Sequence, residues 1–258
     1  MSAPVETLDH GSIREIRLAR PPVNALNTEL CRALIHAVDS AVAAGVRGIV
    51  LTGNERIFSA GMDVPYLLSL GENRHALHDA WQAFFGAARA LADARVPVVA
   101  AITGHAPAGG CVLALCCDYR VMARSTDPER PFAIGLNETQ VGLVAPEGIQ
   151  RLMRRLVGPH RAERLLVAGE MVPAERAQAI GLVDELVDQA EVVARAVAWL
   201  EHLLKLPHHP MLQTRAIARA DVVEAMSPEL IQLDRFIDAW DAPDTQAALH
   251  ALVAKLRK

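Results

Sequence analysis

The stretch Gly104–Asp118, with the sequence GHAPAGGCVLALCCD, decides the fold of this 258-residue chain. It follows the apolar run VVAAI at 98–102, which is typical of a buried strand, and Gly109 and Gly110 open an apolar helix. Backbone N–H groups at a helix start lack intrahelical partners, and glycine leaves them open to a ligand. The stretch therefore predicts a strand, a turn and a helix whose first N–H groups can face a developing negative charge.

A second turn of the same kind lies upstream. The sequence IFSAGMD at 57–63 follows the strand-like run GIVLTG at 48–53. Two small-residue turns that each follow a strand can converge on one oxygen. Together they predict the two halves of an oxyanion hole.

Helices and strands alternate through most of the chain, which predicts an α/β fold. The first strand is expected between Ile13 and Pro21, and the first helix is expected to have Thr28 as its N-cap and to end at Gly45. A helix-then-strand order recurs at 28–44 and 49–52, at 80–94 and 98–103, and at 174–180 and 182–187.

The C-terminal part reads differently. No strand is expected after Ala190, and helical patterns with apolar stripes continue to the end of the chain. The proline-bracketed segment LPHHP at 206–210 suggests a boundary. We predict an α/β core over residues 1–206 and a helical region over 207–258.

Composition narrows the classes of function. The chain is 52% hydrophobic and 22% charged, with a net charge of −4. No basic run is interleaved with aromatic residues, which argues against a nucleic-acid partner. No apolar run approaches the ~20 residues of a membrane helix, and the first residues do not resemble a secretory signal. We expect a cytoplasmic protein without a membrane partner.

Cysteines and histidines show no metal-ligand pattern. The four cysteines have no CxxC spacing, and buried reduced thiols are expected. His75 and His78 lie in a polar helical stretch, and His208 and His209 lie between prolines, so surface positions are expected for all four. The sequence predicts no metal site.

Three segments resemble the crotonase (enoyl-CoA hydratase/isomerase) superfamily. They are the IFSAGMD turn, the sequence PAGGC at 107–111 with CDYR at 117–120, and IGLNETQVGLVAP at 134–146. The last two are more similar to Δ3,Δ2-enoyl-CoA isomerases than to hydratases. The resemblance covers nearly the whole chain. It implies a spiral of ββα turns with C-terminal helices that build a homotrimer or a hexamer.

The same resemblance implies an acyl-CoA thioester as substrate and no separate cofactor, because coenzyme A is part of the substrate. It places the oxyanion donors on the backbone N–H groups of Met62 and Gly109. It assigns Glu138 as the catalytic base. The apolar residues around Glu138 would raise its pKa toward the working pH.

Two positions separate the possible reactions. Hydratases of the superfamily carry a second glutamate where Val112 stands here. One carboxylate suffices to move a proton from C2 to C4, so isomerisation is expected and hydration is not. Glu147 departs from the isomerase pattern, and it is either a carboxylate at a helix N-terminus or a second acid near the pocket.

Several residues are candidates for coenzyme A. The resemblance points to Lys255 near the C-terminus for the phosphates, and Arg20 is a further cation. Backbone groups around Ala25, Ala60 and Asp63 are expected to meet the pantetheine and adenine parts.

The leading hypothesis is a 3-enoyl-CoA to trans-2-enoyl-CoA isomerase of unsaturated fatty acid β-oxidation. Another crotonase chemistry, such as hydration, thioester hydrolysis or decarboxylation, is the first alternative. A non-catalytic acyl-CoA binder and an RNA-binding relative belong to a different class. The presence of Glu138 argues against the former, and the acidic charge balance argues against the latter.

Overall fold

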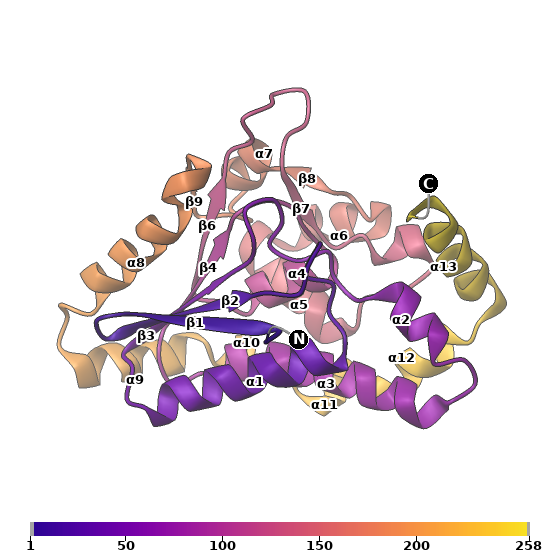
Figure 1. Ribbon diagram of the computed structural model, residues 1–258, viewed down its shortest axis with the longest axis horizontal. Coiled ribbons are helices and arrows are strands. Elements are labelled where there is room, and N and C mark those ends of the chain that lie inside the picture. Colours follow the sequence, from indigo (N-terminus) through magenta and orange to yellow (C-terminus); the bar gives the residue numbers. More distant parts are fainter. Residues whose placement is uncertain (1–2, 257–258) are drawn as a thin grey trace.

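A six-stranded sheet forms the centre of the computed structural model, which describes residues 3–256 (Figure 1). The strand order is β1-β2-β3-β4-β6-β9; β1 and β2 pair antiparallel, and the other neighbours pair parallel. A smaller sheet has the order β5-β7-β8. The strands are β1 Val5–His10, β2 Ile13–Leu18, β3 Gly48–Thr52, β4 Val98–Ile102, β5 Ala106–Pro107, β6 Tyr119–Ala123, β7 Ala133–Gly135, β8 Val172–Pro173 and β9 Glu185–Val187.

Helices cover the main sheet and make up the C-terminal part. The α-helices are α1 Thr28–Ala43, α2 Val64–Ser69, α3 Arg74–Ala92, α4 Gly109–Leu115, α5 Glu147–Val157, α6 Pro159–Ala168, α7 Ala174–Ala179, α8 Val192–Leu203, α9 His208–Ala218, α10 Ala220–Ala225, α11 Pro228–Ile231, α12 Leu233–Trp240 and α13 Pro243–Leu256. The 3-10 helices are η1 Glu138–Val141 and η2 Gln189–Glu191.

The central strands are buried on both faces, as parallel strands usually are. In β4, Val98, Ala100 and Ile102 point into the larger hydrophobic cluster, where α1, α3 and α4 pack. Val99 and Ala101 point the other way, into a cluster with α8. This arrangement places the start of α4 just beyond the carboxyl end of β4.

The predicted fold class is confirmed, with corrections at element ends. Asn27, not Thr28, is the N-cap of α1, because its extended backbone lets its side chain accept from the N–H of Leu30 at 2.9 Å. The Thr28 hydroxyl instead meets Tyr66 at 3.0 Å. Strand β1 was not predicted, because most of its residues are exposed and show no apolar alternation. Helix α3 starts at Arg74, six residues earlier than predicted.

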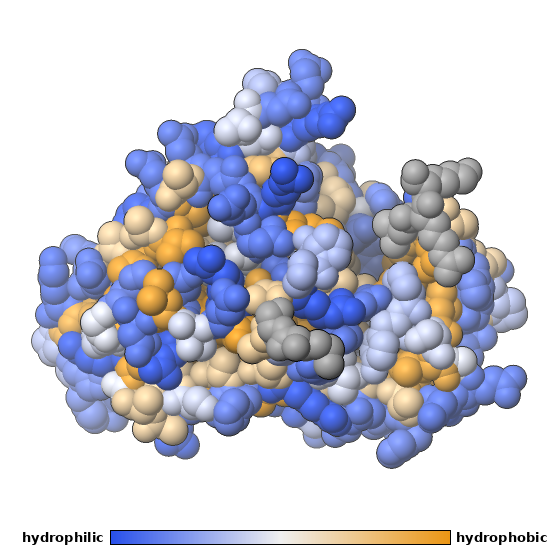
Figure 2. Space-filling model, in the orientation of Figure 1, coloured by the Kyte–Doolittle hydropathy of each residue, from blue (hydrophilic) through white to orange (hydrophobic). Residues whose placement is uncertain are grey.

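The helices after residue 206 pack onto the core in the described chain. Their buried apolar residues, among them Val222, Phe236 and Trp240, belong to the same hydrophobic cluster as the sheet. The boundary at 206–207 stays a prediction. The face in view is mostly hydrophilic with small separate hydrophobic patches (Figure 2). Within residues 3–256, no helix is both long and apolar enough to cross a membrane.

Candidate active site

A cavity of about 580 Å³ lies where the N-terminus of α4 meets the 57–63 turn. Its walls are mostly apolar. It brings together seven of the eight residues singled out from the sequence: Arg20, Ala25, Ala60, Met62, Asp63, Gly109 and Glu138. Lys255 is the exception, because it is exposed on α13 and does not line the cavity.

The two glycine-containing turns are in backbone contact. Gly61 has φ +81°, and a Cβ placed there would lie 3.1 Å from the backbone N of Gly109. A Cβ on Gly110 would lie 2.6 Å from the carbonyl oxygen of Ser59, so a side chain there would force the turns apart. Glycine at 61 and 110 therefore serves the close approach of the two turns, and this approach brings the start of α4 next to Met62.

The backbone geometry at Gly109 and Met62 is compatible with the N–H donors predicted from the sequence. Gly109 is the first residue of α4, so its N–H has no intrahelical acceptor. Leu26 and Met62 form a parallel bridge in which Leu26 makes both bonds: its N–H donates to Gly61 O at 2.8 Å, and Asp63 N–H donates to its carbonyl oxygen at 2.9 Å. The N–H of Met62 is thereby left on the side away from Leu26.

A buried polar scaffold holds the 57–63 turn. Asn24 Nδ2 donates to the carbonyl oxygen of Phe58 at 3.2 Å, and Ser59 Oγ donates to the carbonyl oxygen of Asn24 at 2.8 Å. Arg20 bridges to Asp63 at 2.7 Å and donates to the carbonyl oxygen of Ala25 at 2.7 Å. The Arg20 charge is thus already paired with a carboxylate at the edge of the cavity.

Ala108 has a backbone conformation that non-glycine residues rarely adopt, with φ +45° and ψ −117°. Its N–H donates to the carbonyl oxygen of Gly135 at 2.8 Å, in the small sheet. The φ and ψ angles of Ala108 set the direction of the peptide unit that follows it, and that unit carries the Gly109 N–H. Such strained residues persist where the surroundings over-determine them, often at functional sites.

Glu138 is the ionisable group of the cavity wall whose side chain forms no ion pair within residues 3–256, since Arg20 and Asp63 pair with each other. It begins η1, directly after β7. Its Oε2 is buried, and no hydrogen-bond partner for it exists among residues 3–256. Burial raises the pKa of Glu138 to about 7. The neighbouring Asn137 Oδ1, which sequence reasoning missed, is also buried without a partner in the described part of the chain.

Val112 and Glu147, the two positions that distinguish isomerisation from hydration, lie in different places. Val112 lies on α4, 2% exposed, and lines the cavity. Glu147 lies outside the cavity at the start of α5; it is exposed and accepts from Arg151 Nη2 at 2.7 Å. Of the two alternatives for Glu147, this geometry matches a carboxylate at a helix N-terminus and not a second acid near the pocket.

An aromatic wall closes the cavity on the side of α3 and α12. Of the five Phe, three Trp and two Tyr in the chain, three Phe and two Trp line the cavity. Trp81 packs edge-on against Phe236 and Trp240, with ring centroids 4.6 Å and 5.7 Å apart, and stacks on Phe85. The helical spacing of these residues in each segment was a signal for an apolar face, but it does not show that the two faces meet. The wall consists of Trp81, Phe84, Phe85, Phe236 and Trp240.

The arrangement supports proton transfer next to an oxygen that gains negative charge. Met62 and Gly109, whose N–H groups are the predicted donors, line an apolar cavity, and Glu138, with a pKa of about 7, lies in the same cavity. In the low dielectric of such a cavity, both donors and carboxyl act more strongly than in water.

Known proteins resemble this chain in sequence and in structure. The chain is 31% identical over 257 residues to "Enoyl-CoA delta isomerase 1, mitochondrial" of Mus musculus, covering 98% of this chain and 87% of that protein. It is 35% identical over 222 residues to "Probable enoyl-CoA hydratase EchA17" of Mycobacterium bovis, covering 84% and 80%. The crystal structure of human mitochondrial delta3-delta2-enoyl-CoA isomerase superposes with a TM-score of 0.90 at 28% identity, covering 98% of both chains.

The family comparison covers nearly the whole chain. The model of the enoyl-CoA hydratase/isomerase family matches residues 9–253. The match includes both glycine-containing turns, the segment around Glu138 and most of the C-terminal helices. The chain therefore belongs to the enoyl-CoA hydratase/isomerase (crotonase) family of enzymes.

Proposed function

We propose that this enzyme moves the double bond of 3-enoyl-CoA esters to the trans-2 position, in the degradation of unsaturated fatty acids. The observation that carries the proposal is the single unpartnered carboxyl group in the cavity. Asp63 also lines the cavity, but Arg20 and the N–H of Tyr66 engage its two oxygens. Glu138 is left with a pKa of about 7, which suits a group that must both accept and return a proton.

In the proposed mechanism, the thioester oxygen accepts from the N–H groups of Met62 and Gly109. Glu138 removes a proton from C2, and the electron pair moves into a dienolate whose negative charge is on that oxygen. The protonated Glu138 then returns the proton to C4, which leaves the double bond between C2 and C3. The reaction is balanced without an added cofactor.

Val112 favours isomerisation over hydration. Hydration requires that a water molecule be held and activated, and the apolar Val112 side chain offers it neither a donor nor an acceptor. Glu147 lies outside the cavity and cannot replace the missing group. The names of the relatives include both isomerase and hydratase, so this step needs a direct test.

The residues that line the cavity indicate where the acyl chain and the coenzyme A part of the substrate bind. The aromatic wall offers an apolar surface to the acyl chain. Ala25, Ala60 and Asp63 line the cavity, and we assign the pantetheine and adenine parts to this stretch of its wall. Lys255 lies away from the cavity, so we propose that it meets the coenzyme A phosphates only across an assembled homotrimer or hexamer.

The test compares two substrates with the same purified full-length protein and no added cofactor. We expect conversion of 3-hexenoyl-CoA to the conjugated 2-enoyl ester, measured by ultraviolet absorbance and chromatography. We expect hydration of crotonyl-CoA to be at least about a hundredfold slower, on the scale of losing one positioned catalytic group. Hydration at a comparable rate would contradict the proposed reaction.

A pair of variants sharpens this test. Val112→Glu adds a second carboxyl group at the wall, and we expect it to increase crotonyl-CoA hydration. Val112→Gln has almost the same size without the charge and serves as the control. Equal hydration by both variants would mean that the residue at 112 does not select the reaction.

A further inference from the structure

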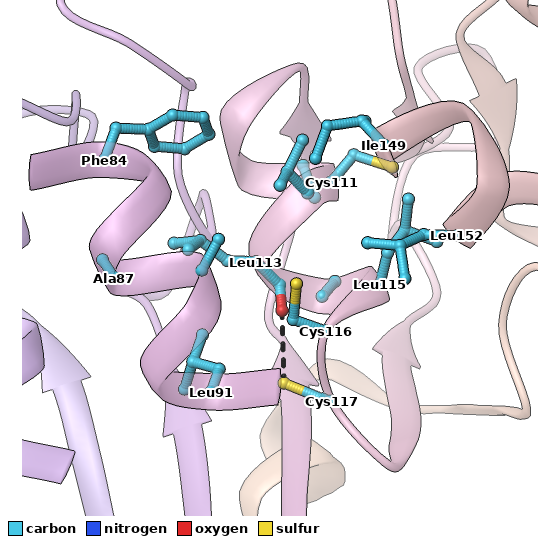
Figure 3. Packing of buried hydrophobic residues seen from close by; sticks show 14 of the residues in the cluster. Phe84, Ala87, Leu91, Cys111, Leu113, Leu115, Cys116, Cys117, Ile149 and Leu152 are labelled. Atoms are coloured by element: carbon cyan, nitrogen blue, oxygen red, sulfur yellow. Dashed lines mark hydrogen bonds between the residues drawn. The ribbon is translucent and has the colours of Figure 1, made fainter. Parts of the chain in front are cut away.

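The C-terminal end of α4 is closed by arginine side chains that come from distant parts of the sequence. All seven residues of α4 are buried, so its last carbonyl groups cannot reach water. Figure 3 shows the tight packing of α4 between α3 and α5, with Cys117 Sγ donating to the carbonyl oxygen of Leu113 at 3.3 Å. Buried carbonyl groups at a helix end require donors from elsewhere.

Two guanidinium groups donate to the carbonyl groups of Cys116 and Cys117, the two residues that directly follow α4, and we call these two arginines the carbonyl clamp. Arg219 donates from Nη2 to the carbonyl oxygen of Cys116 at 2.7 Å and from Nη1 to that of Cys117 at 3.2 Å. Arg120 donates from Nη1 to the carbonyl oxygen of Cys117 at 3.2 Å. The Arg219 side chain is 10% exposed, and that of Arg120 is 4% exposed. A cation at this end is also favourable to the helix dipole.

Carboxylates hold the clamp in place. Asp118 Oδ1 lies 3.3 Å from Arg219 Nε, and Asp184 Oδ2 lies 2.6 Å from Arg120 Nη2. Arg215 engages both oxygens of Asp118 at 2.7 and 2.8 Å, and Asp118 also accepts from the N–H of Val98. The C-terminal helices are thereby tied to the start of β4 and to the residues that directly follow α4.

The opposite end of α4 has no charged side-chain anchor and is held by a backbone hydrogen bond from the Ala108 N–H to the carbonyl oxygen of Gly135 at 2.8 Å. Its N-cap residue, Ala108, makes no side-chain capping bond, and Gly109 and Gly110 have no side chains. A helix of seven residues is marginal by itself, so its position depends on its surroundings. The clamp fixes one end of a rigid segment about 10 Å long, and the first N–H of the other end is the Gly109 donor.

We infer that Arg219 is a positioning residue for the oxyanion hole: by holding the carbonyl groups of Cys116 and Cys117, directly after α4, it helps to set the place of the Gly109 N–H at the other end of the helix. The inference rests on the proposed acyl-CoA function. It assigns a part in catalysis to a side chain of the C-terminal helical region that does not line the cavity.

The experiment uses full-length Arg219→Met and the matched control Arg215→Met. Arg215 belongs to the same network, where it contacts Asp118 and the carbonyl oxygen of Ala94 at 2.7 Å but not the carbonyl groups directly after α4. The direct readout is the ultraviolet absorbance of the enolate of bound acetoacetyl-CoA, a 3-oxoacyl thioester whose enolate charge falls on the thioester oxygen. Steady-state kcat and KM with 3-hexenoyl-CoA and thermal stability are measured beside it.

We expect Arg219→Met to lower the enolate fraction and to lower kcat by about tenfold, less than the 10²–10³-fold loss from deleting an oxyanion donor. KM should change by less than about threefold. Arg215→Met should lower thermal stability and leave the enolate fraction within about twofold of the wild type. Arg219→Lys keeps the charge but offers one ammonium head, and we expect it to recover part of kcat.

The other possible results contradict either the inference or the proposed function. A normal enolate fraction and kcat in Arg219→Met would overturn the inference, as would equal losses in Arg219→Met and Arg215→Met, which would indicate general destabilisation. If Arg219→Met does not fold, wild-type values in Arg219→Lys would overturn it, because a lysine ammonium lacks the planar fork that gives the two N–H groups of Arg219 their fixed directions. A wild-type protein that does not bind acetoacetyl-CoA would overturn the proposed function itself.

Discussion

The segment around Glu138 and the first turn of α5 around Glu147 present the same chemical group in opposite surroundings. Glu138 lies in the cavity, where its buried Oε2 has no partner in the described chain. Glu147 is exposed and paired with Arg151 one helical turn later. Burial without a partner raises the pKa of Glu138 to about 7.

The difference teaches that surroundings decide what a glutamate can do. A carboxyl group that titrates near neutral pH can accept a proton from carbon and return it. A solvated carboxylate paired with an arginine on the next turn stabilises its helix instead. Four predictions test this comparison.

The largest effect is expected for Glu138→Gln. The amide keeps the shape of the side chain but cannot accept the C2 proton, so kcat for 3-hexenoyl-CoA should fall by about 10²–10⁴-fold. Binding of a non-reactive acyl-CoA should persist, because Met62 and Gly109 contribute backbone groups. Calorimetric titration and turnover measured on the same preparation check both expectations. Near-normal turnover would mean that another group carries the proton.

The second effect is the pH dependence of the wild type. Glu138 must be ionised to accept a proton, and its pKa is about 7. The value of kcat/KM should therefore be level above pH 8 and fall about tenfold for each unit below 7, to about a hundredth of the plateau at pH 5. A profile that stays level down to pH 5 would show that burial does not raise the pKa of the working carboxyl group.

The third effect concerns folding stability. The pKa of Glu138 is raised in the folded state above its ordinary value of 4.5, so the folded state binds this proton more tightly than the unfolded state does. The wild type should lose stability as the pH rises from about 4.5 to 7. Glu138→Gln lacks this cost and should be more stable at pH 8 by about 1–3 kcal/mol. Urea unfolding at pH 8 and pH 4.5 measures the difference, which should vanish at the lower pH.

The smallest effect is expected for Glu147→Gln. The substitution removes an exposed ion pair and a carboxylate at the N-terminus of α5, so the free energy of unfolding should fall by roughly 0.5 kcal/mol or less. Turnover should stay within about twofold of the wild type, since Glu147 does not line the cavity. Kinetics on Glu138→Gln and Glu147→Gln in parallel decide between them: a large loss at Glu147 alone would reverse the comparison.

Local patterns were enough to predict much of the site. The apolar runs before residues 57 and 104 identify strands, and small residues after them identify turns with free N–H groups. These features depend on neighbours in the chain, so the α/β class and the two glycine-containing turns follow from the sequence. The assignment of Glu138 came from the resemblance to a family, because a lone glutamate before an apolar segment is usually a surface residue.

Only the tertiary structure decided how distant segments meet. Strand β1 is held by pairing with β2 and not by its own pattern, and the aromatic wall joins α3 to α12 across more than 140 residues. Asp63 pairs with the charge of Arg20, and Arg219 donates to the carbonyl group of Cys116, directly after α4, from 103 residues away. Burial and pairing across such separations set the pKa of Glu138, the solvent exposure of Glu147 and the place of α4. These properties cannot be predicted from neighbours in the sequence, because they arise only when distant segments meet in the folded chain.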